Sequence, residues 1–183
     1  MSFIFMNSTA QNKTREIIVT RNDTVIKCRV LNEKKKYSTH SDRMYYWYKA
    51  QEVYKNLGGY DGLLLSDYYS MYYDNKLIEK GKFKDGLKQG EWKEWYLNGD
   101  LKQIESFKNG LKNGKSYYYS EQKLYMLKSY KKGKLHGKTY IYKNDTVEIM
   151  TFRNGIKDIP KEKSELKNSK NATRDDLENE EIK

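Results

Sequence analysis

Hydrophobic and polar residues alternate in short stretches between residues 64 and 155, and turn-forming residues separate these stretches. From Gly90 to Tyr96, successive side chains fall on opposite sides of an extended chain, and Trp92 and Trp95 place aromatic rings on both sides. An alternation of period two predicts β-strands. Strands of roughly five to seven residues joined by short turns can pair only as antiparallel neighbours.

The same pattern occurs four times in succession, so this part of the chain is an internal repeat. Each copy closes on an aromatic residue, two further residues and a glycine, and the closing glycines Gly86, Gly110, Gly133 and Gly155 are 24, 23 and 22 residues apart. Such a period indicates a repeat architecture. We therefore predict an all-β fold, an antiparallel β-meander of repeated hairpins that forms an elongated, single-layer twisted sheet.

The recurring residues are predicted to specify shape rather than chemistry. Asn98–Gly99 should form a type I′ turn, because both central residues of that turn need positive φ, which Asn and Gly adopt more readily than other residues. Aromatic residues on paired strands should hold the sheet together through cross-strand contacts. The structural repeat positions are Gly90, Trp92, Trp95, Tyr96, Asn98, Gly99, Leu101, Phe107, Gly110, Gly133 and Gly155.

The rest of the chain divides around this array. Residues 13–44 should contain a hairpin, since β-branched runs flank Asn22–Asp23, and this hairpin should cap the array. Residues 45–62 have the aromatic strand and closing Gly62 of a degenerate copy, so the array is predicted to span 45–156. Residues 157–183 carry dense mixed charge and few apolar residues, which predicts a flexible tail.

Residues 1–12 look like the end of a secretory signal, with an apolar run before the small residues Ser8, Thr9 and Ala10. The run is short and no basic residue precedes it. We therefore predict an exported protein, periplasmic or in the cell envelope, whose signal is incomplete and whose true start lies upstream of Met1. The alternative is a cytoplasmic protein with a disordered N-terminus.

Composition changes the expected core. Only 37% of the residues are hydrophobic, mean hydropathy is −1.05, and 18 residues are Tyr. Tyr can bury its ring while its hydroxyl stays in contact with water. The sheet should therefore be thin and hydrated, without a large central core.

The net charge of +11 lies on the folded part of the chain, since the tail is nearly balanced. A basic face attracts anionic partners such as nucleic acid, anionic lipid or acidic protein. The basic residues are interleaved with Glu and Asp, however, which favours a solvated surface that keeps exposed strands from aggregating.

Candidate chemistry is sparse. The single cysteine, Cys28, excludes an internal disulfide, and it shares a strand face with Ile26 and Val30, which predicts a small buried side chain. With only His40 and His136 no Cys/His zinc site of the usual kind can form. His136 is predicted to be a turn residue equivalent to Gln89 and Asn113. We predict no catalytic, cofactor-binding or metal-binding residues and no enzymatic activity.

Lysine and aromatic residues alternate in three of the copies, an arrangement that could stack bases or sugars. We favour aromatic ladders shielded by lysine stems, and do not expect nucleic acid as a partner. The residues concerned are Lys93, Trp95, Lys115, Tyr117, Tyr119, Lys138, Tyr140 and Tyr142.

The pattern Gly-x-[Trp/Tyr]-x-x-[Trp/Tyr]-Tyr-x-Asn-Gly-x-Leu, closing on Phe-x-x-Gly and clearest from Gly90 to Gly110, resembles the MORN-repeat variant of the bacterial YwqK antitoxin-like family. The resemblance covers about residues 45–156. The third copy departs from it at Ser116 and at 120–123, and the fourth at Thr139 and 144–145. Family membership would imply a non-enzymatic protein that neutralises a toxin, whereas eukaryotic MORN arrays are associated with membranes, phospholipids and scaffolding.

Two functions follow from these observations. The first is a protein-interaction module of an antitoxin or immunity type, because a repeat array without a catalytic constellation offers mainly surface. The alternative is a basic surface that binds anionic lipid or an envelope polymer. An enzyme would require a deep pocket with convergent polar groups.

Overall fold

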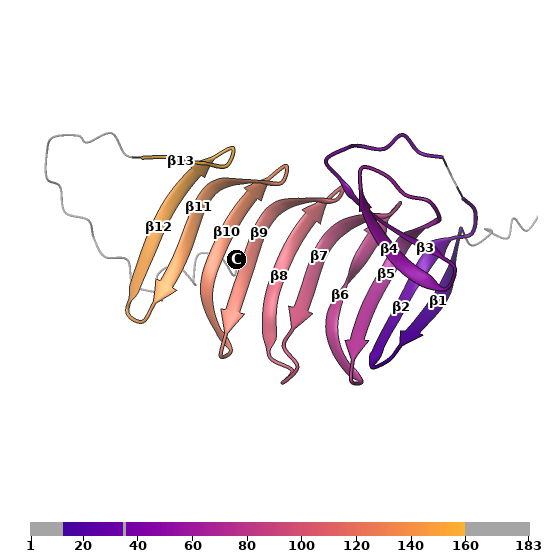
Figure 1. Cartoon of the computed structure of the whole chain (residues 1–183). Helices are drawn as coiled ribbons and strands as arrows, with labels where there is room; N and C mark the ends of the chain where they lie inside the picture. Colours follow the sequence, from indigo (N-terminus) through magenta and orange to yellow (C-terminus); the bar gives the residue numbers. More distant parts are fainter. Residues whose placement is uncertain (1–12, 35, 160–183) are drawn as a thin grey trace, which may run out of the picture.

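The computed structural model describes residues 13–34 and 36–159, and within them the protein is all β (Figure 1). The strands are β1 (Thr14–Arg21), β2 (Thr24–Leu31), β3 (Met44–Lys49), β4 (Glu52–Leu57), β5 (Leu63–Tyr73), β6 (Lys76–Lys84), β7 (Leu87–Trp95), β8 (Leu101–Lys108), β9 (Leu111–Ser120), β10 (Lys123–Lys131), β11 (Lys134–Lys143), β12 (Thr146–Arg153) and β13 (Ile156–Lys157).

The fold prediction is confirmed. From β5 to β13 each strand pairs antiparallel with the next one in sequence, and β2 and β1 extend the same open sheet beyond β5. The strands stand side by side as arched ribbons in an elongated array (Figure 1). From β5 to β12 they are 8 to 11 residues long, longer than the sequence pattern predicted, because the links between copies are themselves parts of strands.

Residues 45–62 depart from the expectation that they form a further copy in line with the array. Strands β3 and β4 pair with each other, β3 pairs with β5 only at Trp47 and Tyr48, and both lie off the main path of the sheet. In consequence, β5 pairs with β2 of the N-terminal hairpin instead of with this hairpin. Figure 1 shows β3 and β4 crossing over the neighbouring strands of the sheet.

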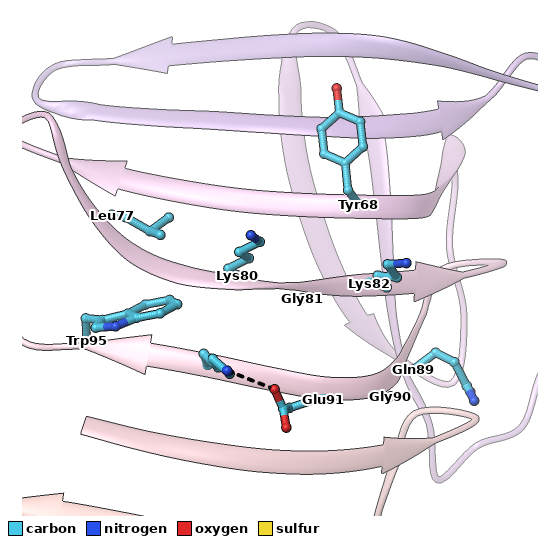
Figure 2. Close-up of a pocket in the computed structure, with 10 residues that line it drawn as sticks. Tyr68, Leu77, Lys80, Gly81, Lys82, Gln89, Gly90, Glu91 and Trp95 are labelled. Atoms are coloured by element: carbon cyan, nitrogen blue, oxygen red, sulfur yellow. Dashed lines mark ion pairs between the residues drawn. The ribbon is translucent and has the colours of Figure 1, made fainter. Parts of the chain in front are cut away.

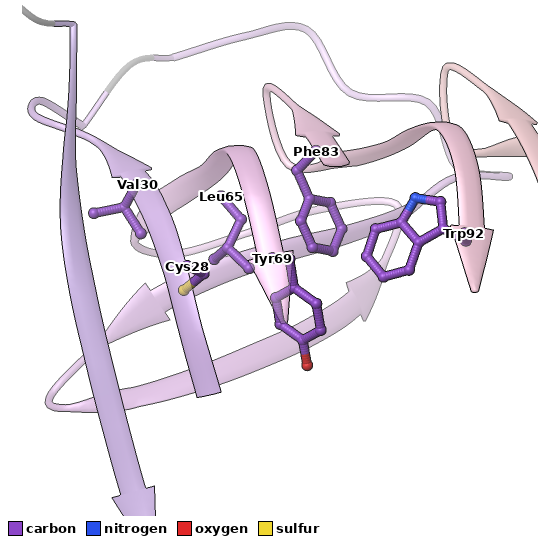
Figure 3. Close-up of a cluster of buried hydrophobic side chains, with 6 residues drawn as sticks. All are labelled: Cys28, Val30, Leu65, Tyr69, Phe83 and Trp92. Carbon is purple, nitrogen blue, oxygen red and sulfur yellow. The ribbon is translucent and has the colours of Figure 1, made fainter. Parts of the chain in front are cut away.

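The β3–β4 hairpin covers the main hydrophobic core. Six buried residues form that core on one face of β2, β5, β6 and β7 (Figure 3): Cys28, Val30, Leu65, Tyr69, Phe83 and Trp92. Tyr46, Tyr48 and Val53 of the hairpin pack against it. The other side of β3 is also buried, because Tyr45 and Trp47 form a second cluster with Leu31 and Leu64. A single sheet thus acquires a local second layer over its N-terminal half.

The closing glycines are the second residues of tight two-residue turns between copies. Asp85–Gly86, Asn109–Gly110, Lys132–Gly133 and Asn154–Gly155 all have positive φ at both positions, as type I′ turns require. Each glycine N–H donates to a carbonyl oxygen about one copy earlier, for example Gly110 to Lys88 at 2.9 Å and Gly133 to Lys112 at 2.8 Å. The recurring glycines therefore stack the copies.

A β-bulge recurs in the first strand of every copy. The pairing register slips at corresponding places in the β2–β5, β6–β7, β8–β9 and β10–β11 ladders. At these places Asp67, Gly90, Gly114 and Gly137 have positive φ. Because a bulge bends its strand, this repetition explains why all the strands arch in the same sense.

The turn at Asn98–Gly99 differs from the prediction. Only Gly99 has positive φ, and its N–H donates to the carbonyl oxygen of Tyr96 at 2.9 Å. The N–H of Tyr96 in turn donates to the carbonyl oxygen of Asp100. This is a three-residue loop of the type I turn plus G1 bulge form, instead of a two-residue type I′ turn. Asn98 accepts a hydrogen bond from the Asp100 N–H, which favours this longer loop.

The predicted signal at 1–12 and most of the predicted tail, from residue 160 onward, lie outside the described residues. Within the part of the chain that the structure describes, no helix is long and apolar enough to cross a membrane.

Candidate functional site

The sheet has two faces, which the pairing register defines. On the face that carries the β3–β4 hairpin, hereafter the hairpin face, one row of directly opposed residues runs through Trp92, Glu105, Ser116, Lys128, Thr139 and Met150. On the other, hereafter the lysine face, a row runs through Lys80, Lys93, Ile104, Tyr117, Leu127, Tyr140 and Ile149. The alternating lysine and aromatic residues of the sequence all lie on the lysine face.

On the hairpin face Glu79 and Glu105 pair with lysines, whereas Lys128 makes no ion pair with a described residue and its ammonium lies 5.4 Å from the centre of the Tyr118 ring. Lys88 pairs with Glu79 at 2.7 Å, and its ammonium lies 3.8 Å from the centre of the Trp92 ring. Glu105, although buried, pairs with Lys112 and accepts a hydrogen bond from the Tyr118 hydroxyl at 3.0 Å. Burial raises the pKa of Tyr118, and its hydrogen bonding to Tyr130 and the charge of Glu105 raise it further. The polar groups of Glu105, Lys112 and Tyr118 therefore have partners within the protein, and we interpret this network as structural.

Along the lysine face, one edge of the array is lined by apolar pairs. In every copy an aromatic residue of the first strand lies directly opposite an aliphatic residue of the second, just before the turn. The four pairs are Tyr72 with Leu77, Trp95 with Leu101, Tyr119 with Leu124, and Tyr142 with Val147. All but the buried Tyr142 are half-buried, so each pair covers part of its own surface and leaves part in contact with solvent.

A groove of about 480 Å³ lies on the lysine face over β5, β6 and β7 (Figure 2). Leu77 and Trp95 form an apolar wall, while Lys80, Lys82 and Lys93 supply positive charge. Tyr68, Gln89 and Glu91 complete its polar lining, and Gly81 and Gly90 add no side chains. The groove therefore offers cations beside an apolar surface.

The cations of this groove are only partly matched. Lys93 pairs with Glu91 at 3.1 Å, but Lys80, directly opposite Lys93 in the ladder, makes no ion pair with any described residue. Lys82 likewise makes no ion pair with another residue in the ranges 13–34 and 36–159. Burial and a hydrogen bond to Glu16 raise the pKa of Tyr68 to about 12, so this residue brings a neutral hydroxyl to the groove.

The structural repeat positions fall into different places. Trp92 is buried on the hairpin face, where its ring occupies the space above Gly81, and Phe107 packs nearby at a centroid distance of 6.5 Å. Trp95 and Gly90 line the groove. Tyr96 is exposed at the turn, where its hydroxyl donates to the carbonyl oxygen of Tyr119. The sequence did not predict that Lys80 and Lys82 adjoin Trp95, because that depends on the β6–β7 register.

Two predictions about reactive residues have an outcome. Cys28 is buried as predicted, with no exposed surface, and burial raises the pKa of its thiol to about 12. His136 lies within β11 and not in a turn as predicted, and its Nδ1 accepts a hydrogen bond from the backbone N–H of Asn154 in the next link turn, at 3.5 Å. Gln89 and Asn113 make the equivalent contacts with Asn109 and Lys132, so these three side chains serve the same structural purpose.

Among the described residues, no group of three or more His, Cys, Asp and Glu side chains is arranged to hold a metal ion. Comparison of the chain with protein-family models, with curated proteins and with solved structures gave no match.

Proposed function

We propose that this protein is a non-enzymatic interaction module, of an antitoxin or immunity type, whose protein partner binds the lysine face. The observation that carries the proposal is the contrast in charge pairing and apolar exposure between the two faces. On the hairpin face Glu79 and Glu105 are paired with lysines and Lys128 lies over the Tyr118 ring, whereas the lysine face combines lysines that are only partly paired with carboxylates and half-buried aromatic and aliphatic residues.

The residue types of the lysine face support a protein as the partner. Tyr and Trp supply large contact areas with few rotatable bonds, and they are enriched where binding energy is concentrated. Eight strands, from β5 to β12, at about 4.8 Å each would offer a surface roughly 40 Å long. Such a surface suits a partner that contacts several copies at once.

Site-specific photo-crosslinking in the native host tests this proposal. Tyr117 and Tyr118 are neighbours in β9, both half-buried, but they project from opposite faces. A photoreactive phenylalanine at Tyr117 should give a discrete crosslink to one protein, and the same group at Tyr118 should not. Equal crosslinking from both positions, or none from Tyr117 in a folded variant, would contradict binding through the lysine face.

The antitoxin type has its own test, applied to the protein captured at Tyr117. Its expression alone should arrest growth, and co-expression of this protein should restore growth. If the captured protein is harmless on its own, the interaction module stands and the antitoxin function does not.

The second candidate function is binding to anionic lipid or an envelope polymer, and the unpaired Lys80 and Lys82 favour it. Cosedimentation with anionic vesicles should then fall steeply as salt rises from about 50 to about 200 mM, because salt screens the attraction between the lysine side chains and the anionic surface. Absence of binding at low salt, or equal binding to neutral vesicles, would remove this candidate.

A further inference from the structure

We infer that the groove formed by Lys80, Lys82, Lys93, Leu77 and Trp95 binds an acidic peptide segment in which carboxylates stand next to an aliphatic side chain. The inference rests on the proposed function, because it places the partner's principal contact within the lysine face.

Strands β6 and β7 carry a pair of like charges on each face, and this allows a direct comparison. On the hairpin face Glu79 lies opposite Glu94, and both are neutralised, by Lys88 at 2.7 Å and Lys102 at 2.9 Å. On the lysine face Lys80 lies opposite Lys93. Among the described residues Glu91 pairs with Lys93, and no carboxylate pairs with Lys80. Like charges directly opposite one another destabilise a ladder. An external carboxylate would supply the missing countercharge.

The apolar side of the groove sets the second requirement. Leu77 and Trp95 stand beside the lysines, and Gly90 adds no side chain to the space between them. A Cβ built on Gly90 would have no neighbour within 4 Å. A volume of about 480 Å³ accommodates a few side chains. The ligand should therefore bring an aliphatic group against Trp95 together with its carboxylates.

The distribution of charge favours a peptide over a uniformly charged polymer. Beyond Lys93, the same row continues with Ile104, Tyr117 and Leu127, which offer no countercharge. Glu91 at the groove and Glu16 at Tyr68 would repel further negative charges. A polypeptide can alternate carboxylates and apolar groups to match this surface, whereas a nucleic acid or a sulfated polysaccharide cannot.

Binding of a fluorescent peptide that repeats the sequence Glu-Glu-Leu tests the inference on the full chain. Fluorescence anisotropy should detect binding, and the matched Gln-Gln-Leu peptide should not bind. The double variant Lys80→Gln/Lys82→Gln should lose about tenfold or more in affinity, because two charge-assisted contacts are removed. Lys131→Gln/Lys134→Gln removes the same charge from exposed positions of β10 and β11 and should retain the affinity.

Tryptophan emission localises the binding site. The peptide should change the emission of the wild-type protein, and Trp95→Phe should abolish the change, since Trp47 and Trp92 are buried away from the groove. The Lys80→Gln/Lys82→Gln variant, hereafter the groove variant, should also be at least as stable as the wild type in urea, because residue 80 no longer repels Lys93. This control separates lost binding from lost folding.

Three outcomes would overturn the inference: no peptide binding, equal loss in the groove and control variants, or tighter binding of heparin or anionic vesicles through the same lysines. The proposed function fails separately, if Tyr117 gives no specific crosslink. If that crosslink persists but the peptide does not bind, or binds the Lys80→Gln/Lys82→Gln variant normally, only the inference fails: the partner then uses the apolar rows and the groove is not its site.

Discussion

The two halves of the hairpin face fill the same position of the repeat in different ways. In the first two copies this position holds Tyr69 and Trp92, which the β3–β4 hairpin covers, and in the last two it holds the small residues Ser116 and Thr139. All four side chains are buried. Burial therefore comes from a second layer in the N-terminal half and from neighbouring side chains of the sheet itself in the C-terminal half.

The lysine face shows the opposite gradient along the same strands. Its central row begins with Lys80 and Lys93 and continues into Ile104, Tyr117 and Leu127. One sheet can thus present apolar residues to its own hairpin at one end and, through the half-buried Ile104 and Tyr117, to solvent or a partner at the other, while Leu127 is buried between its neighbours in the ladder. We infer that the N-terminal half supplies most of the stability. The lysine face, which no second layer covers among the described residues, is the more accessible of the two faces for binding.

Truncation of the two tryptophans of β7 should separate these roles. Trp92 is 3% exposed and contacts the rings of Tyr69 and Phe83, so Trp92→Ala should cost about 3–5 kcal/mol of unfolding free energy. Trp95 is half-buried on the lysine face, and Trp95→Ala should cost about 1–2 kcal/mol. Urea unfolding followed by circular dichroism measures both.

The ratio of the two losses is the informative quantity. Equal losses would mean that the lysine face is as important for stability as the core under the hairpin. A variant lacking the Trp95 ring should instead be folded and deficient in binding the acidic peptide.

Alkaline pH should destabilise the fold, in part through the core of the hairpin face, because this core contains ionisable groups. Burial raises the pKa of Cys28 from 9.0 to about 12 and that of Tyr46 from 10.0 to about 12. Their neutral forms are favoured by folding, so this stability is complete below about pH 9 and is lost as pH rises toward 12. For each group the loss is about 1.4 kcal/mol per pH unit between the two values.

Urea unfolding at a series of pH values would measure this slope, with Cys28→Ala as the comparison variant. The variant should be less stable at neutral pH, because it leaves a small cavity, but its stability should fall less steeply above pH 9. Identical slopes for the two proteins would show that the thiol ionises as readily in the folded protein as in the unfolded chain.

How far the sequence could predict this molecule depends on whether a feature is local. The all-β meander and the burial of Cys28 follow from period-two alternation and glycine turns, which are properties of neighbouring residues. The departure of β3–β4 from the array was not predictable, because residues 45–62 have the local pattern of a repeat copy. The groove also escaped prediction, since it depends on Lys80 lying opposite Lys93, and a shift of register would have separated them.

Removal of a buried hydroxyl should stabilise the C-terminal half. Thr139 is 2% exposed, and its Oγ1 has no hydrogen-bond partner among the described residues. Thr139→Val keeps the shape and removes the buried polar atom, so it should raise the unfolding free energy by about 1 kcal/mol. Thermal unfolding reports the change, and Ser116→Ala provides a second instance in the third copy. A destabilised Thr139→Val variant would instead show that the hydroxyl is hydrogen-bonded, for example by water.

The smallest effect concerns the recurring bulge, at which the first copy alone has a residue other than glycine. Asp67 has φ of 81°, where the other copies place Gly90, Gly114 and Gly137. A side chain in this conformation costs about 1 kcal/mol relative to glycine. The carboxylate of Asp67 lies 4.0 Å from the guanidinium of Arg29, a long and partly exposed contact that contributes at most a few tenths of a kcal/mol.

Because relief of backbone strain outweighs the lost ion pair, Asp67→Gly should stabilise the protein by about 0.5–1 kcal/mol, measured by urea unfolding. Gly90→Asp is the reciprocal change at an uncrowded bulge, and it should destabilise by a similar amount. If Asp67→Gly were destabilising, the contact with Arg29 would be worth more than the strain, and β2 would depend on it for its attachment to β5. If it stabilises the fold and also weakens binding of the acidic peptide, Asp67 helps to shape the lysine face beside Tyr68.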